Sequence, residues 1–257
     1  MRQISVNDQD QSHNLAGFGS TKTLAFCLAL TLSACGPAAS PSGITDPHEA
    51  QNREFHAFNL ALDKNLVRPV ATAYTQITPD PIKNGVTNFA ANLDIPGYVV
   101  NNILQLRLGK AVENTLRFAL NTTIGIGGLF DPATAMGVNG KETDFGETLH
   151  LWGMPEGNYV ELPVFGPSND RDELGMIVDY ALNPLRLIIP ADKAYIDTLT
   201  GLASKIGERG RYSDTVDSIL YESADGYAQA RLLYTDHRRF NLGQEAAADT
   251  FEDPYAQ

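Results

Sequence analysis

Helix-start signals recur along the chain and restrict it to a mainly α-helical fold. Asp46-Pro47-His48-Glu49 combines an acid at the N-cap, a proline at the first helical position and a glutamate at N3, the pattern of a capping box. Asp80-Pro81 repeats the acid–proline pair, and Asp144-Phe145-Gly146-Glu147 and Ser168 predict two further caps. After these signals, apolar residues recur at intervals of three and four, which is the spacing of one helix face.

The apolar faces predict a series of amphipathic helices separated by proline and glycine. The predicted segments are a helix interrupted at Arg68-Pro69, one from Asp80 to Pro96, a segment opened by Pro96 and broken at Gly109, a helix from Lys110 to Ile124, a short helix through Leu149 and Trp152, one from Ser168 to Asn183-Pro184, and helices from Ala191 to Glu208 and from Ser213 to about Phe240. Tyr159–Phe165 alternates like a strand, but Pro163 limits it to an edge strand or an extended connector. We expect one domain over residues 46–242 and a disordered acidic tail over residues 243–257.

The N-terminal segment has the pattern of a secretion signal. An apolar run from Leu24 to Leu32 follows Lys22 and precedes two small residues, and it is too short to span a bilayer. Leu32-Ser33-Ala34-Cys35 resembles a lipobox, in which the cysteine thiol takes a diacylglyceryl group. The sequence therefore predicts a signal peptide over residues 1–34 and a lipid anchor at Cys35.

The residues that follow the anchor support this interpretation. The stretch from Gly36 to Gly43 is polar and rich in Gly, Ser and Pro, so residues 35–45 are expected to form an acylated tether. The alternative, a buried helix with two incidental cysteines at Cys27 and Cys35, does not account for this stretch. Gly36 stands where an inner-membrane retention signal would typically be Asp, which predicts an outer-membrane location.

The charge of the chain limits its partners. The formal net charge is -12, so nucleic acid is excluded as a partner. An acidic protein also gains nothing from anionic lipid headgroups, and its membrane association must come from acyl chains and apolar surface.

Signatures of catalysis, cofactors and metals are absent from the sequence. It has no Gly-x-Ser-x-Gly elbow, no His-Glu-x-x-His pair, no phosphate loop and no EF-hand loop. Asp144-Phe145-Gly146 matches a kinase tripeptide without the accompanying kinase motifs and is predicted to be a helix cap. Gly125-Ile126-Gly127-Gly128 follows a predicted helix, so we interpret it as a helix terminator or hinge. We predict no catalytic residue, no cofactor and no metal site.

Asn, Pro and Gly residues stand at fixed places among the apolar residues, and their order resembles that of the MlaA (VacJ) family over residues 46 to 190. The motifs that carry the resemblance are Asp46-Pro47, Asn52-Arg53, Phe58-Asn59, Arg68-Pro69, Asn84-Gly85, Asn88-Phe89, Asn92-Leu93, Pro96, Asn101, Leu104-Gln105, Arg117-Phe118, Asn121-Thr122-Thr123, Gly125, Gly127-Gly128, Asp131, Asp144-Phe145-Gly146, Thr148-Leu149, Trp152-Gly153, Leu162-Pro163, Gly166-Pro167-Ser168, Arg171-Asp172 and Gly175.

The resemblance implies a ring-like bundle of amphipathic helices around an amphipathic channel, embedded in the inner leaflet of the outer membrane. It further implies association with a trimeric porin, extraction of misplaced phospholipid from the outer leaflet, and delivery of that lipid to a soluble periplasmic carrier. In the family a hairpin borders the channel, and the corresponding glycine turn here is Gly125, Gly127 and Gly128. We expect Asn88, Phe89, Asn92 and Leu93 to pack beside this turn and to form a gate or hinge with it.

Other interpretations of these residues also fit the sequence. Each Asn residue could simply cap a helix, and each apolar face could belong to an ordinary soluble core. An acylated protein that binds small solutes or acts as a scaffold would share the anchor and the acidic charge. A phospholipid hydrolase is a third class, which the missing nucleophile disfavours.

Overall fold

The computed structural model of the protein describes residues 43–185, 191–193 and 195–244. All of them belong to the second of two units into which the chain divides, residues 39–257. The predicted leader, the Cys35 anchor, most of the tether and the tail from residue 245 lie outside the described residues.

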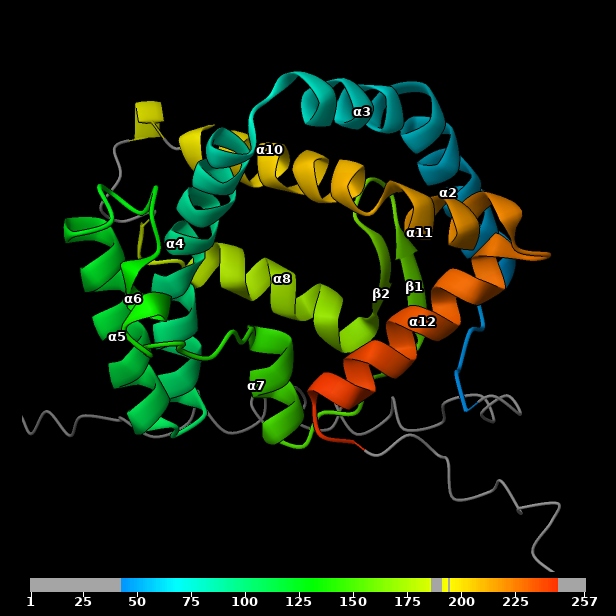
Figure 1. The fold of residues 1–257 in the computed structure, drawn as a ribbon. Helices are drawn as coiled ribbons and strands as arrows, with labels where there is room; N and C mark the ends of the chain where they lie inside the picture. Colours follow the sequence, from blue (N-terminus) through cyan, green and yellow to red (C-terminus); the bar gives the residue numbers. More distant parts are fainter. Residues whose placement is uncertain (1–42, 186–190, 194, 245–257) are drawn as a thin grey trace, which may run out of the picture. The chain divides into compact units, whose positions relative to one another are not determined.

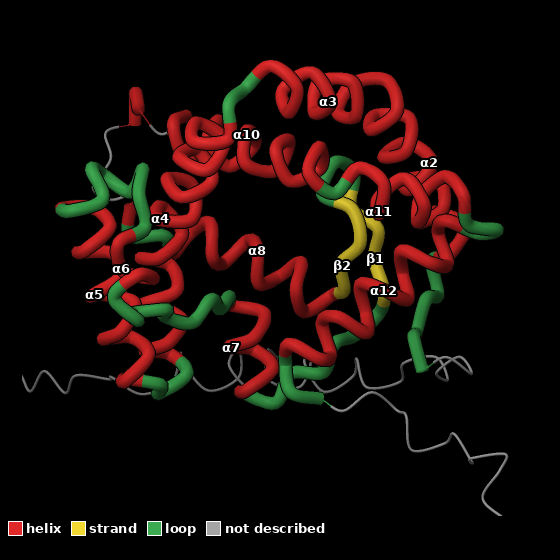
Figure 2. Tube along the Cα trace, in the orientation of Figure 1, coloured by secondary structure: helices red, strands yellow, loops and turns green. Residues whose placement is uncertain are grey.

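The described residues are mainly helical, as the sequence predicts (Figures 1 and 2). The elements are α2 (Glu49–Leu62), the π-helix η1 (Asp63–Val67), α3 (Arg68–Ile77), α4 (Asp80–Leu104), α5 (Leu108–Thr123), α6 (Pro132–Ala135), α7 (Phe145–Leu151), β1 (Tyr159–Leu162), β2 (Gly166–Asn169), α8 (Asp170–Leu182), the 3-10 helix η2 (Ala191–Lys193), α10 (Tyr195–Arg211), α11 (Ser213–Asp217), the π-helix η3 (Ser218–Glu222) and α12 (Gly226–Asn241).

Within this unit the elements form a closed circuit, in which each element contacts the next and the last contacts the first. The long helix α4 packs against α5 on one side and against α10 and α8 on others, and α10 also packs against α3. From α3 the chain of contacts continues through η1 and α2 to β1, then to β2 and back to α8. Figure 1 shows the elements arranged around this closed circuit.

The two short strands form an antiparallel hairpin, with Tyr159 opposite Asn169 and Leu162 opposite Gly166. Pro163 lies in the turn between them, so the sequence prediction of a short edge strand is confirmed. The outer edge of β1 is covered by asparagine side chains of α2. The Asn52 amide donates to the Tyr159 carbonyl and accepts from the Glu161 N–H, and Asn59 makes the same pair of bonds with Leu162 and Val164.

The first and last described segments meet at this hairpin. The Asp46 carboxylate accepts hydrogen bonds from the Tyr227 hydroxyl and from Arg231, both on α12. Ile44 is buried with Tyr159 and Tyr227, which is the only apolar cluster found among the buried residues that the structure describes. These contacts fasten the start of the domain to its last helix.

Burial is inverted relative to an ordinary soluble protein. Large apolar side chains are widely exposed, among them Ile77 (80%), Leu106 (85%) and Phe240 (79%). The buried positions are mostly polar, and the largest fully buried side chains include Arg171, Glu161 and Asn102. Extended exposed apolar surface marks a region that contacts another protein or a membrane. The apolar helix faces are therefore not an ordinary soluble core.

Three asparagines of the family motifs and of α5 are not helix caps. Asn101, Asn114 and Asn121 lie inside helices, are buried, and hydrogen-bond to other segments. Asn114 donates to the Lys141 carbonyl at 2.8 Å and accepts from the Lys141 N–H at 3.1 Å. Because an amide side chain offers a donor and an acceptor together, it can pair with a backbone segment as another backbone would.

Two prolines do not end helices where the sequence predicted that they would. Pro69 lies in the first turn of α3, where a missing N–H is tolerated, and the π-helical turn η1 joins α2 to α3 without a break. Pro96 lies inside α4, which runs on to Leu104. Contacts of α4 with α5, α8 and α10 hold the helix together across the hydrogen bond that Pro96 cannot make.

Three other boundaries differ from the prediction. Asp46 does not cap α2, which has His48 at its N-cap, because the Asp46 carboxylate binds α12 instead. The break before α5 falls at Leu106, whose φ is 58°, and Gly109 is inside α5. The predicted helix from Ser213 to Phe240 is divided, because Asp225 starts α12 by accepting from the Ala228 N–H.

Candidate functional site

Three adjoining cavities are lined by elements of this circuit together with α12. The largest, about 790 Å³, lies between α3, α4 and α10 and extends to Glu142 and His237. A second cavity of about 390 Å³ shares Glu142 with it, and a third of about 300 Å³ shares His237. Asp144 and Arg238 line both smaller cavities, so the three spaces adjoin one another around these side chains.

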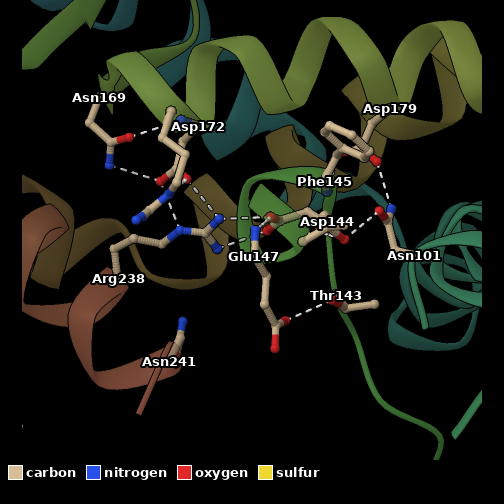
Figure 3. A network of polar contacts seen from close by, with 12 residues as sticks. Asn101, Thr143, Asp144, Phe145, Glu147, Asn169, Asp172, Asp179, Arg238 and Asn241 are labelled. Atoms are coloured by element: carbon tan, nitrogen blue, oxygen red, sulfur yellow. Dashed lines mark hydrogen bonds and ion pairs between the residues drawn. The ribbon is translucent and has the colours of Figure 1, made fainter. Parts of the chain in front are cut away.

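The side chains of α7, α8 and α12 meet where the smaller cavities join (Figure 3). Arg238 donates to both oxygens of Asp144, at 2.8 and 2.7 Å, and to both oxygens of Asp172, at 2.7 and 2.9 Å. Asp144 also caps α7 by accepting from the Glu147 N–H at 2.7 Å, which confirms the cap predicted from the sequence. One guanidinium thus ties α12 to the starts of two other helices.

Asp172 is held in its ionised form by this arrangement. Burial alone would raise the pKa of Asp172, but hydrogen bonds from Arg238 and from the Tyr234 hydroxyl outweigh it and keep the pKa below its usual value. Burial would lower the pKa of Arg238, but its hydrogen bonds to Asp144 and Asp172 raise it. The predicted cap at Ser168 is wrong by one residue, because Ser168 pairs in β2 and Asn169 caps α8 by accepting from the Asp172 N–H.

A second polar chain joins α4 to α7 and α8. Asn101 donates to the Asp179 carboxylate at 2.7 Å and accepts from the Thr148 hydroxyl at 2.9 Å. Asp179 in turn accepts from the Phe145 N–H at 2.9 Å (Figure 3). A side chain at Gly146 would come within 2.4 Å of Asp172, so this helix start must be glycine for the three helices to approach.

The predicted gate residues lie together at the flank of α4. The Gly128 N–H bonds to the Asn121 carbonyl at 2.8 Å, and a Cβ at Gly128 would lie 2.7 Å from Asn92. Asn88 donates to the Leu129 carbonyl at 3.3 Å, and Asn92 donates to the Thr122 hydroxyl. The predicted packing of Asn88 and Asn92 beside the glycine turn is therefore confirmed, while the role of these residues as a gate stays a prediction.

The sequence interpretation missed the residues that line the cavities. None of the predicted gate residues lines the three spaces within the described part of the chain. Asp144 and Asp172 belong to motifs that carry the family resemblance, but Arg238 lies 94 and 66 residues away from them in the sequence. No local pattern signals such a contact, because Arg238 lies in an ordinary helical stretch.

The described part of the chain shows neither a metal-ligand cluster nor a membrane-spanning helix. The described residues contain no group of three or more His, Cys, Asp or Glu side chains placed to hold a metal ion. No described helix is both long and apolar enough to cross a bilayer. Asp144, Asp172 and Arg238 are instead engaged with each other, in bonds that join helices.

The sequence profile of the MlaA lipoprotein family matches residues 44–241, which is almost the whole described part of the chain. The chain belongs to the MlaA lipoprotein family. Among relatives of this family, the Escherichia coli K12 intermembrane phospholipid transport system lipoprotein MlaA is 32% identical, over 91% of this chain and 92% of that protein. The protein of the same name from Haemophilus influenzae is 30% identical, over 63% of this chain and 68% of that protein.

Further similarity comes from a protein of another genus and from a solved structure. An uncharacterized protein of Rickettsia felis is 39% identical, over 73% of this chain and 74% of that protein. A structure solved in work on the structural basis for maintenance of bacterial outer membrane lipid asymmetry aligns with a TM-score of 0.68 at 32% identity. The alignment covers 77% of this chain and 99% of that chain, so the MlaA fold extends through the domain.

Proposed function

We propose that this protein extracts misplaced phospholipid from the outer leaflet of the outer membrane through the passage inside its circuit of helices. It then delivers the lipid to a soluble periplasmic carrier. Acyl chains on Cys35 hold it on the periplasmic side of that membrane, and a trimeric porin is its partner there. Similarity to lipoproteins of an intermembrane phospholipid transport system supports this proposal.

The observation that carries the proposal is the inverted distribution of polar and apolar side chains. A phospholipid has a charged headgroup and two apolar tails, and exposing each CH₂ to water costs about 0.8 kcal/mol. Two exposed acyl chains would therefore cost well over about 10 kcal/mol. Charged cavities can receive the headgroup, while the exposed apolar surface lets the protein lie among acyl chains.

The experiment is to purify the protein from membranes and analyse what it carries. We expect phospholipid to remain bound through purification, and we expect no lysophospholipid or free fatty acid to accumulate on incubation with vesicles. A small-solute binder or a scaffold would retain no phospholipid and would stay dispersed without detergent once its lipid anchor was removed. Release of fatty acid in proportion to protein concentration, lost on a single substitution, would assign the protein to the hydrolases instead.

A further inference from the structure

The largest cavity is lined by two charged side chains of opposite sign that lack an ion-pair partner among the residues the structure describes. Lys83 in its wall pairs with Asp80 at 2.8 Å, and Glu208 pairs with Lys205 at 3.5 Å. Arg211, in contrast, has no carboxylate within 4.0 Å among the described residues and donates only to the Asn84 side chain.

Glu142 is the matching acidic group. It lines both the largest cavity and the adjoining one, is exposed, and makes no ion pair or side-chain hydrogen bond within the described ranges. Arg211 ends α10, whereas Glu142 lies in the loop before α7. The two groups therefore come from different elements and face one water-accessible space.

The lining of the three cavities, taken together, is acidic. The charged side chains of the three cavities number seven acidic and four basic, a formal excess of three negative charges. An added anion meets repulsion here unless it also brings a positive charge.

We propose that this cavity selects zwitterionic phospholipid headgroups, with Arg211 binding the phosphate and Glu142 binding the ammonium group. A guanidinium matches the oxygens of a phosphate, and a carboxylate matches an ammonium cation. A headgroup with a phosphate and no ammonium can bind Arg211, but Glu142 and the other carboxylates of the lining repel its negative charge. This selection rests on the proposed function, because it concerns the lipid that passes through the same cavities.

The test is competition between two lipids of defined charge. Purified protein is equilibrated with vesicles of equal phosphatidylethanolamine and phosphatidylglycerol, and the bound lipid is quantified by mass spectrometry. We expect wild type to be enriched in phosphatidylethanolamine, and Glu142→Lys to shift the bound ratio about fivefold toward phosphatidylglycerol, as one exposed charge pair allows. Arg211→Gln should reduce retention of both lipids.

Glu54→Lys is the matched control, because Glu54 is exposed on α2 and does not line these cavities. It makes the same change of charge and should leave the ratio as in wild type. Glu142→Gln serves as a second variant if the lysine variant melts early. A wild-type ratio equal to that of the vesicles, or equal shifts in Glu142→Lys and Glu54→Lys, overturns the selection alone. Absence of any phospholipid from wild type overturns the proposed function as well.

Discussion

Arg238 shows what a single side chain does in this protein. Its guanidinium forms bonds with both oxygens of Asp144 and of Asp172, so α12, α7 and α8 share one fastening point. The Asp172 carboxylate is buried and relies on this cation to offset its lost hydration. Removing one partner of a buried ion pair leaves an uncompensated charge, which is more damaging than replacing the whole pair.

Arg238→Ala should therefore lower the free energy of unfolding by about 3–5 kcal/mol. Arg53→Ala is the control, because Arg53 forms exposed ion pairs with Glu49 and Asp225, and its loss should change stability by about 1 kcal/mol or less. Chemical denaturation in detergent measures both variants. Similar losses for the two arginines would mean that burial does not set the contribution of Arg238.

At the scale of elements, the sequence predicted where most helices begin but not how they are joined. The Asp144 cap was predictable because its acceptor and donor lie three residues apart. The continuation of α4 through Pro96 was not, since it depends on helices that pack around it. Nor were the paired bonds of Asn52 and Asn59 to the edge of β1, because the partners lie more than 100 residues away. Residues close together in the sequence determine where helices start and where the chain turns. The candidate site, in contrast, is built from contacts between residues far apart in the sequence.

The glycine turn between α5 and α6 gives a test at this scale. Gly127 and Gly128 both have positive φ, 71° and 96°, but only Gly128 faces another element, with Asn92 2.7 Å from an added Cβ. Gly127→Ala should lower the free energy of unfolding by about 1–2 kcal/mol, because alanine is disfavoured in a left-handed backbone conformation. Gly128→Ala should lower the free energy of unfolding further, because the added Cβ would also clash with Asn92 and force the turn away from α4.

Thermal unfolding compares the two alanine variants directly. If they prove equally stable, the turn does not depend on its contact with α4. The gate that we propose from Asn88, Phe89, Asn92, Leu93, Gly125, Gly127 and Gly128 would then lose its mechanical basis.

At the scale of the whole molecule, a moving gate and a static passage predict different defects on mutation. Damage to a gate should let lipid leak, whereas damage to a static passage should only abolish transport. Deleting Asn88 and Phe89 removes the bond to the Leu129 carbonyl and should uncouple α4 from the glycine turn. We expect a dominant, toxic phenotype with phospholipid in the outer leaflet, because a loosened gate lets lipid leak. Surface phospholipid is measured in cells that also express wild type, and thermal unfolding confirms that the variant folds.

A cross-link gives the opposite perturbation of the same gate. Gly85 on α4 faces this turn, because an ideal Cβ there would lie 3.7 Å from the Leu129 carbonyl oxygen and 3.9 Å from Leu129 Cδ2, so Gly85 and Leu129 are the positions to test with a pair of cysteines. The oxidised Gly85→Cys, Leu129→Cys protein should stop transport without unfolding, and a reductant should restore it. Normal transport by the oxidised protein, together with a deletion that behaves as simple loss of the protein, would identify a static pore.

The fastening of Asp46 to Tyr227 and Arg231 has a consequence for the order of synthesis. A chain grows from its N-terminus, and these partners stand 181 and 185 residues after the carboxylate that they bind. Contacts of such long separation form late in folding. Until α12 has been made, Asp46 has neither of these partners, and the start of the domain is not fastened to its last helix. A chain terminated before α12 therefore contains every element of the circuit of helices but lacks the fastening of its first residues, and what remains at Asp46 is the local hydrogen bond from the Asn52 amide at 2.9 Å.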